Sequence, residues 1–282
     1  MKAPGISSYA RDQARARLKQ FLAAQRHARG HLDDAESIHD LRVSIRRLTQ
    51  CLKIFNGLFA PGPVKKFHRR LKKLMDRCAD VRNCDIATEL LHQAGSADGP
   101  SIPNLKVVRK DAAHTLQNHV NRSHRRRKSK WMKGLQLELQ EGSEWVLGET
   151  VAENLARILP GMAADFFAAG RAALAKGSHY HSLHQFRLRT KRFRYALELF
   201  PDFYANELPA RLQLLRGLQD LLGAINDCVT TIPLLGKDRQ GTSAVRLLLK
   251  RREGEFRRFY RLHYPPQAEA DWISWLSSPR KS

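Results

Sequence analysis

Cysteines are scarce in this chain, and their spacing excludes the sites that cysteines usually build. The four thiols are Cys51, Cys78, Cys84 and Cys228 among 282 residues. None of them belongs to a CxxC pair or has zinc-finger spacing, and all fall within helical patterns. We expect buried free thiols, as in a reducing cytoplasm.

Long apolar runs are also missing. No run approaches the ~20 apolar residues that a membrane-spanning helix needs. The N-terminal segment, residues 1–5, has no apolar core of the kind found in signal peptides. The sequence therefore predicts a cytoplasmic protein that does not bind a membrane.

The common catalytic motifs are absent. The sequence contains no HExxH, GxSxG or GxGxxG. Gly57 and Gly62 have P-loop spacing, but Pro63 stands where the P-loop lysine would be, which excludes that phosphate site. Phosphoryl transfer would need clustered carboxylates to hold Mg²⁺, whereas the aspartates are scattered singly. We predict no catalytic residue, no metal and no cofactor, and we expect the aspartates to cap helices or to pair with arginines.

Negatively charged residues are scarce relative to positively charged ones. The chain has 27 Asp and Glu against 50 Lys and Arg, which gives a net charge of +23 and a pI of about 10.5. Such an excess destabilises a compact protein by self-repulsion unless its partner is a polyanion. Nucleic acid, an anionic membrane and inorganic polyphosphate are such polyanions, and we set the membrane aside because the helical patterns commit their apolar faces to cores. The hydrophobic content of 42% is that of an ordinary globular protein.

Helical periodicity runs through nearly the whole chain, with no convincing strand pattern. Apolar residues recur with 4-3-4-3 spacing over 41–55, 67–81 and 186–200. This spacing puts an apolar stripe along one side of a helix. We predict an all-α protein whose helices cover residues 8–29, 37–58, 63–94, 103–134, 148–176, 182–200, 205–233 and 242–263.

One stretch of the sequence occurs twice. Residues 37–55 recur as residues 182–200 at a constant offset of 145. The aligned pairs are His39 with His184, Arg42 with Arg187, Arg46 with Lys191, Arg47 with Arg192, and Phe55 with Phe200. The similarity extends upstream, and downstream with a one-residue slip, so one four-helix unit was built twice. We predict a first repeat over 1–145, a second over 146–264, and a tail over 265–282 whose tryptophans dock on a bundle.

Each copy opens with the pattern of a helix N-terminus. Ser37 with Asp40, and Ser182 with Gln185, have the spacing of a capping box. Such caps would place both histidines in the first helical turn, where the free N–H groups and the helix dipole favour anions.

The charges that follow are all positive in both copies. Over 42–53 and over 187–194 the sequence contains Arg and Lys but no Asp or Glu. A solvated helix face normally mixes the two signs in i,i+4 pairs. The repetition of an unmixed cationic face therefore favours an anion-binding surface.

The predicted anion-binding residues lie on these faces and on neighbouring basic runs. They are His39, Arg42, Arg46, Arg47, Lys53, Lys73, Arg82, Arg126, Lys130, His184, Arg187, Lys191, Arg192, Arg194 and Tyr195. We further expect Arg82 and Asp85 to form a partly buried pair. His179, His181 and His184 form HxHxxH, but positions i and i+2 do not share a helix face, so we predict no metal site there.

These residues resemble the signature of the CHAD family, the conserved-histidine α-helical domain. The two histidine motifs match as His39-x-x-Arg42-Val43-x-x-Arg46-Arg47 and His184-x-x-Arg187-x-x-x-Lys191-Arg192-x-Arg194-Tyr195. Leu222-Gly223-x-x-Asn226-Asp227 resembles the third-helix motif of the second half, and Arg82-Asn83-Cys84-Asp85 resembles its counterpart, with Asn83 in place of an Asp. The resemblance covers roughly residues 8–263.

The resemblance implies two tandem four-helix bundles related by internal pseudo-twofold symmetry, with a basic groove or pore between them. It also implies binding of inorganic polyphosphate, often at cytoplasmic polyphosphate granules. The chain has neither the length nor the ExExK motif of the triphosphatase domain fused to some members. We therefore predict a binding module and not an enzyme.

Two alternatives stay open. Any surface with this charge is expected to bind nucleic acid weakly and in a salt-sensitive way. Specific single-strand binding would need aromatic rings among the cations, and Tyr195 is the ring that we expect to be exposed. The other alternative is a metal-dependent enzyme that processes polyphosphate.

Overall fold

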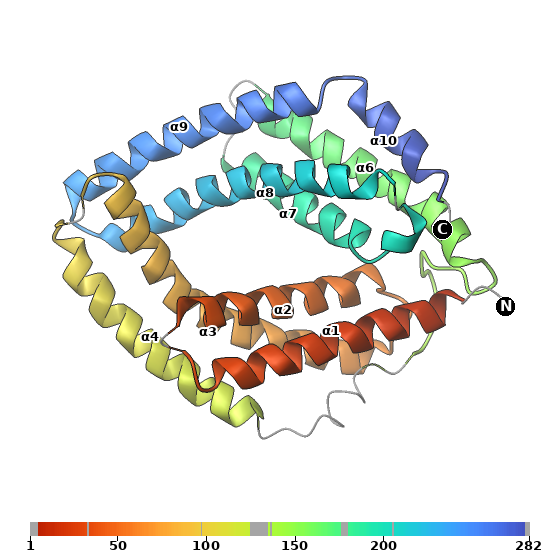
Figure 1. Ribbon diagram of the computed structural model, residues 1–282, viewed down its shortest axis with the longest axis horizontal. Coiled ribbons are helices and arrows are strands. Elements are labelled where there is room, and N and C mark those ends of the chain that lie inside the picture. The colour runs from red at the N-terminus through yellow and green to blue at the C-terminus, as the bar shows by residue number, and fades with distance from the viewer. Residues whose placement is uncertain are drawn as a thin grey trace. The chain divides into compact units, whose positions relative to one another are not determined.

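The computed structural model describes residues 5–32, 34–96, 98–124, 135, 137–175, 180–204 and 206–279. Over these residues the chain is all-α, as predicted, and its extended pairing consists of the isolated bridges Gly5–Thr150 and Phe59–Leu137. The α-helices, shown in Figure 1, are α1 (Ile6–Ala28), α2 (Ala35–Ile54), α3 (Pro61–Gln93), α4 (Ser101–His124), α6 (Val151–Leu174), α7 (Tyr180–Leu197), α8 (Leu208–Thr231), α9 (Arg239–His263) and α10 (Ala268–Leu276). The 3-10 helices η2 (Pro201–Phe203) and η3 (Ile232–Leu235) follow α7 and α8.

Two predicted helix starts are wrong. Helix α2 begins earlier, because Asp34 is its N-cap and its carboxylate accepts from the backbone N–H groups of Glu36 and Ser37. The hydroxyl of Ser37 also donates to Asp34, 3.0 Å away, so Ser37 is not the cap. Helix α7 begins at Tyr180, which puts Ser182 inside the helix. Both histidines consequently lie a turn further into their helices than predicted.

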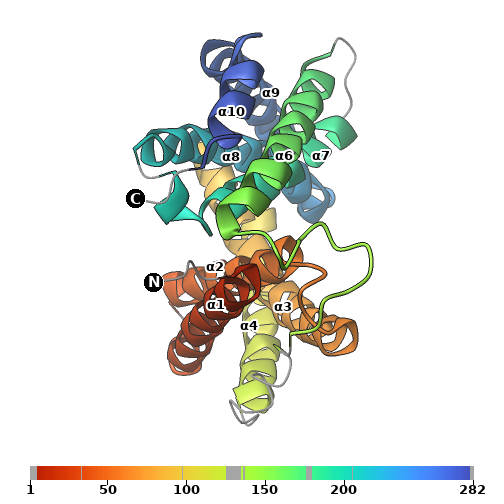
Figure 2. The same ribbon diagram turned by 90° about the vertical axis from the view of Figure 1, so that its right-hand side faces the viewer.

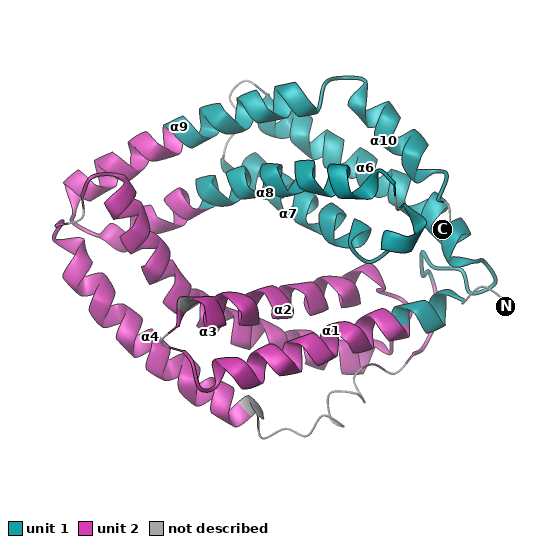
Figure 3. Ribbon diagram, viewed as in Figure 1, with its two compact units in different colours: residues 1–10, 142–226, 251–282 teal, residues 11–141, 227–250 magenta. Residues whose placement is uncertain are grey.

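The chain divides into two compact units, coloured in Figure 3. Unit 1 comprises residues 1–10, 142–226 and 251–282, and unit 2 comprises residues 11–141 and 227–250. Helices α8 and α9 each contribute one part to each unit. The units are defined by spatial contacts, whereas the repeats predicted for 1–145 and 146–264 are defined by sequence similarity. The units therefore do not test the repeats, which stay a prediction.

In unit 2, helix α3 packs against both α2 and α4 (Figure 1). The predicted stripes of α2 and α3 form the contact surface: Leu41, Leu48, Leu71 and Val81 are all buried. Towards the end of α3 a second cluster forms from residues of α3, α4, α8, η3 and α9, namely Ala87, Leu90, Leu91, Ile102, Leu105, Cys228, Leu235 and Val245. The apolar periodicity read from the sequence thus identifies the buried face of each helix.

The core of unit 1 is aromatic. Helix α6 packs against α7 and α10 (Figure 2), and the ring of Phe166 lies 5.3 Å from that of Phe186 and 5.4 Å from that of Phe193. Trp272 of α10 is buried, with its ring 5.4 Å from Phe193. The prediction that the tail tryptophans dock on a bundle is confirmed for Trp272.

All four cysteines are buried and free, as predicted. Burial raises the pKa of Cys51 and of Cys78 to about 12, so both thiols stay protonated at neutral pH. Among the described helices, none combines the length and the apolar character that crossing a membrane requires.

The packing of α6 against α9 predicts a site that is sensitive to a single methyl group. A Cβ on Gly170 would lie 2.7 Å from the Cζ atom of Tyr260, whereas a Cβ on Gly161 of the same helix would meet nothing within 4 Å. We expect Gly170→Ala to lower the free energy of unfolding by about 1–3 kcal/mol through overpacking. We expect Gly161→Ala to be neutral or to stabilise by up to about 1 kcal/mol. Urea denaturation of both variants checks this, and equal stability of the two would contradict the packing.

Candidate anion-binding sites

Three arginines of unit 2 gather where α2 packs on α3. Arg42 lies within electrostatic reach of Arg46 one turn along α2 and of Arg82 on α3. All three side chains are half-buried. Burial is the main factor that lowers the pKa of Arg42, and repulsion from Arg46 and Arg82 adds to it, while Asp227 opposes it. We refer to Arg42, Arg46 and Arg82 as the arginine cluster.

Arg42 lacks an internal partner for one of its nitrogens. Its Nη1 atom is buried and has no hydrogen-bond acceptor among the described residues. A buried donor without an acceptor costs about 1–3 kcal/mol, and more for a charged group. An anion placed against Arg42 would supply the acceptor and offset the repulsion from Arg46 and Arg82. The cluster is therefore a candidate site for an anion.

The other predicted residues of α2 and α3 are on the surface. His39, Arg47, Lys53 and Lys73 are exposed, and the arginine and the two lysines extend positive charge along these helices. Arg126 and Lys130, also predicted from the sequence, lie outside the described residues.

Unit 1 contains a second cationic group on α7, which we call the histidine cluster: His184, Arg187 and Lys191. The three side chains are half-buried. Burial is the main cause of the lowered pKa of His184, and repulsion from Arg187, His181 and Lys191 lowers this pKa further. A nearby anion would act in the opposite direction, because it favours the protonated imidazolium.

Helix α8 holds the start of α7 in place. The hydroxyl of Tyr180 donates to Oδ1 of Asn226 at 3.0 Å, and the Tyr180 ring lies 6.1 Å from the ring of His184. Asn226 was not among the predicted site residues. The Leu222-Gly223-x-x-Asn226-Asp227 motif, to which it belongs, is the sequence feature that could have identified it.

Two of the predicted binding residues are buried. Arg194 is 8% exposed; its Nη1 pairs with Glu198 at 2.5 Å and its Nε donates to Gln219 at 2.9 Å. Tyr195 is 4% exposed, so it is not the exposed ring that we expected. The reason is that residues 193–197 are all buried, since the end of α7 is covered on more than one side. Arg192 is exposed.

The predicted pairing of Arg82 with Asp85 is also wrong. Oδ1 of Asp85 pairs with Nε of Arg109 on α4 at 2.5 Å, while Arg82 belongs to the arginine cluster. Arg109 is 24 residues away in the sequence, so helical phase alone could not identify it as the partner.

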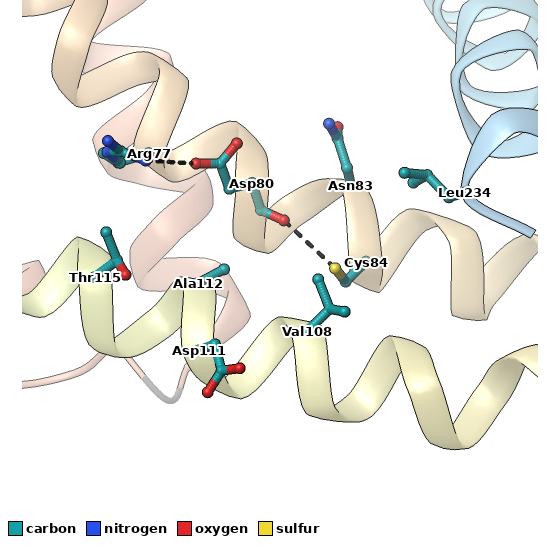
Figure 4. Close-up of a pocket in the computed structure, with 9 residues that line it drawn as sticks. All are labelled: Arg77, Asp80, Asn83, Cys84, Val108, Asp111, Ala112, Thr115 and Leu234. Atoms are coloured by element: carbon teal, nitrogen blue, oxygen red, sulfur yellow. Dashed lines mark hydrogen bonds and ion pairs between the residues drawn. The ribbon is translucent and has the colours of Figure 1, made fainter.

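A cavity of about 400 Å³ between α3 and α4 carries charges of both signs (Figure 4). Its lining includes Asp80, Asp111 and Arg77, and Arg77 pairs with Asp80 at 3.4 Å. The two carboxylates would repel a polyanion. Within the part of the chain that the structure describes, no group of His, Cys, Asp and Glu could hold a metal ion.

Two solved structures are similar to the chain over nearly its whole length. The crystal structure of the CHAD domain from the plant Ricinus communis has a TM-score of 0.63 at 20% identity, and the match covers 99% of this chain and 94% of that one. PptA from Streptomyces chartreusis has a TM-score of 0.62 at 16% identity, with 97% and 99% covered. At these identities the likeness establishes the fold. No curated protein matches the sequence.

A family comparison agrees with the fold. The CHAD domain model matches residues 12–236, which is more than half of the chain. The helices that carry the duplicated histidine motif, α2 and α7, lie within this match. The resemblance read from the motifs is thereby confirmed, and the chain belongs to the CHAD domain family.

Proposed function

We propose that the protein binds inorganic polyphosphate and does not turn it over. The observation that carries the proposal is the buried, unpartnered Nη1 of Arg42 beside two further arginines. Guanidinium groups bind phosphate oxygens through bidentate, charge-assisted hydrogen bonds. The net charge of +23 suits a long polyanion better than a single phosphate.

The histidine cluster is the second binding element of the proposal. Its histidine and cations match those of α2 in the sequence repeat, so we infer that it contacts the same ligand. The family resemblance implies that both elements line one groove between two pseudo-symmetric bundles, and that the protein resides at cytoplasmic polyphosphate granules. Both statements are part of the proposal.

Substitution of the two clusters tests the proposed sites. We expect Arg42→Ala/Arg46→Ala and Arg187→Ala/Lys191→Ala each to weaken the binding of long-chain polyphosphate by about tenfold or more, because each loses two charge-assisted contacts. The fourfold variant should bind still more weakly, with a shallower salt dependence. Calorimetric titration at fixed salt measures the affinities.

The matched control is Arg77→Ala/Arg251→Ala. It removes the same charge from one exposed arginine in each unit, and these arginines pair with Asp80 and Glu255. We expect less than about a threefold change. A folded fourfold variant that binds like the wild type would overturn the site assignment.

The pKa of His184 predicts a pH dependence. Burial and neighbouring cations lower this pKa in the free protein, and a bound polyanion would raise it. Binding therefore takes up a proton, and affinity should increase as the pH falls below the ordinary histidine pKa of ~6.5. His184→Gln should flatten this dependence. Titrations across pH 5–8 measure it, and an unchanged profile in His184→Gln would exclude the proton uptake.

Competition distinguishes polyphosphate from nucleic acid. Single-strand binding needs exposed aromatic rings among the cations. Tyr195, which we expected in that role, is buried, whereas Tyr180 beside His184 is exposed. We expect long-chain polyphosphate to displace single-stranded DNA at equal phosphate concentration, but DNA not to displace polyphosphate. If single-stranded DNA instead displaced polyphosphate, the result would favour a nucleic-acid-binding protein. Release of orthophosphate on addition of Mg²⁺ or Mn²⁺ would show an enzyme.

A further inference from the structure

A second cavity in unit 2 lies where α2 ends and α3 begins. Its volume is about 460 Å³. The segment around Gln140 forms part of its wall and is tied to the α2–α3 turn: Gln140 N donates to Gly57 O at 2.8 Å, and Gln140 Nε2 donates to Phe59 O at 2.7 Å. Gly57 has a φ of 95°, a conformation that favours glycine. The cavity is thus shaped by fixed backbone.

The ionisable groups among the described residues that line this cavity are two lysines and a histidine. Lys53 and Lys65 are exposed at its mouth, and His68 is half-buried. None of the described residues that line it is acidic, in contrast to the α3–α4 cavity with Asp80 and Asp111. The cavity therefore favours an anion.

His68 carries an unmet hydrogen-bonding group. Its Nδ1 atom is buried and has no partner among the described residues. Burial, and then repulsion from Lys53, lower the pKa of His68. An anionic oxygen would give Nδ1 a partner and would compensate the charge of Lys53.

The rest of the lining is largely apolar. Leu52, Phe59 and Val64 belong to it but are at most 8% exposed, whereas Asn56 and Pro61 are exposed. The volume falls within the ~300–1,000 Å³ typical of sites for small organic ligands, and it is much larger than one phosphate group needs. A ligand that fills the cavity would combine an anionic group with an uncharged body.

We propose that this cavity binds a small phosphate monoester of nucleotide size, with its phosphate on Lys53, Lys65 and His68 and its body on Asn56 and Pro61. The site does not depend on the arginine cluster, although Lys53 was predicted from the sequence to contact polyphosphate. No bond is made or broken.

Calorimetric titration with adenosine 5′-monophosphate at physiological salt tests the site. We expect Lys65→Ala and His68→Gln each to weaken binding by about tenfold, through loss of a charge-assisted contact. The matched control Lys66→Ala removes the neighbouring exposed lysine, which does not line the cavity, and should change the affinity less than about twofold. Equal losses in Lys65→Ala and Lys66→Ala would overturn the site.

Comparison ligands identify the ligand chemistry. Adenosine and inorganic phosphate should each bind at least about tenfold more weakly than the monophosphate, since each lacks one half of the ligand. Tighter binding of tripolyphosphate, lost in Lys65→Ala, would overturn the monoester in favour of a polyphosphate end. Absence of binding by the wild type at millimolar monophosphate would also overturn the proposal.

The arginine-cluster variant separates the two proposals. Arg42→Ala/Arg46→Ala should lose polyphosphate affinity and keep monophosphate affinity. Loss of both in this variant would overturn an independent monoester site, while loss of neither would count against the proposed polyphosphate site alone.

Discussion

Helices α2 and α7 must each bury one face while residues 42–53 and 187–194 carry charges of a single sign, and this constraint underlies the rest of the structure. On α2 the stripe that includes Leu41, Ile45 and Leu48 is buried, at about 1.5–3 kcal/mol for each side chain. Repulsion between like charges one turn apart on a helix surface costs only a few tenths of a kcal/mol per pair. Apolar burial therefore outweighs the repulsion, and the helix can hold Arg42 and Arg46 together.

The arginines fall into two kinds, according to whether a carboxylate of the protein pairs with them. Arg109 and Arg194 reach a carboxylate of the protein, Asp85 and Glu198 respectively, so their charges are neutralised inside the fold. Among the described residues, Nη1 of Arg42 is buried without an acceptor, and Arg46 and Arg82 lie close enough to repel its charge. Arginines of the first kind support packing, whereas the arginine cluster is the site that we propose for ligand binding. In the sequence the two kinds look alike, because the difference lies in the partner and not in the residue.

Predictions from the sequence succeeded where the cause is local. The 4-3-4-3 spacing identified the buried stripes, and the isolated cysteines are buried free thiols. Predictions failed where the outcome depended on residues outside the motif, either beside it in the sequence or on another helix. Asp34 caps α2 in place of Ser37, since its carboxylate accepts from two N–H groups of the first turn. Tyr195 is buried because the end of α7 is covered on more than one side, which a single helical stripe does not predict.

By itself the sequence determined an all-α chain, the apolar faces of α2, α3 and α7, and a family membership carried by two histidine motifs. These features depend on periodicity and on residue type, which are local properties. Only the tertiary structure decided which cations lack internal partners, and that Lys53, Lys65 and His68 line one cavity. The reason is that desolvation and pairing depend on residues from different helices, such as Arg82 beside Arg42 and Arg109 beside Asp85. Separation along the chain does not encode these distances.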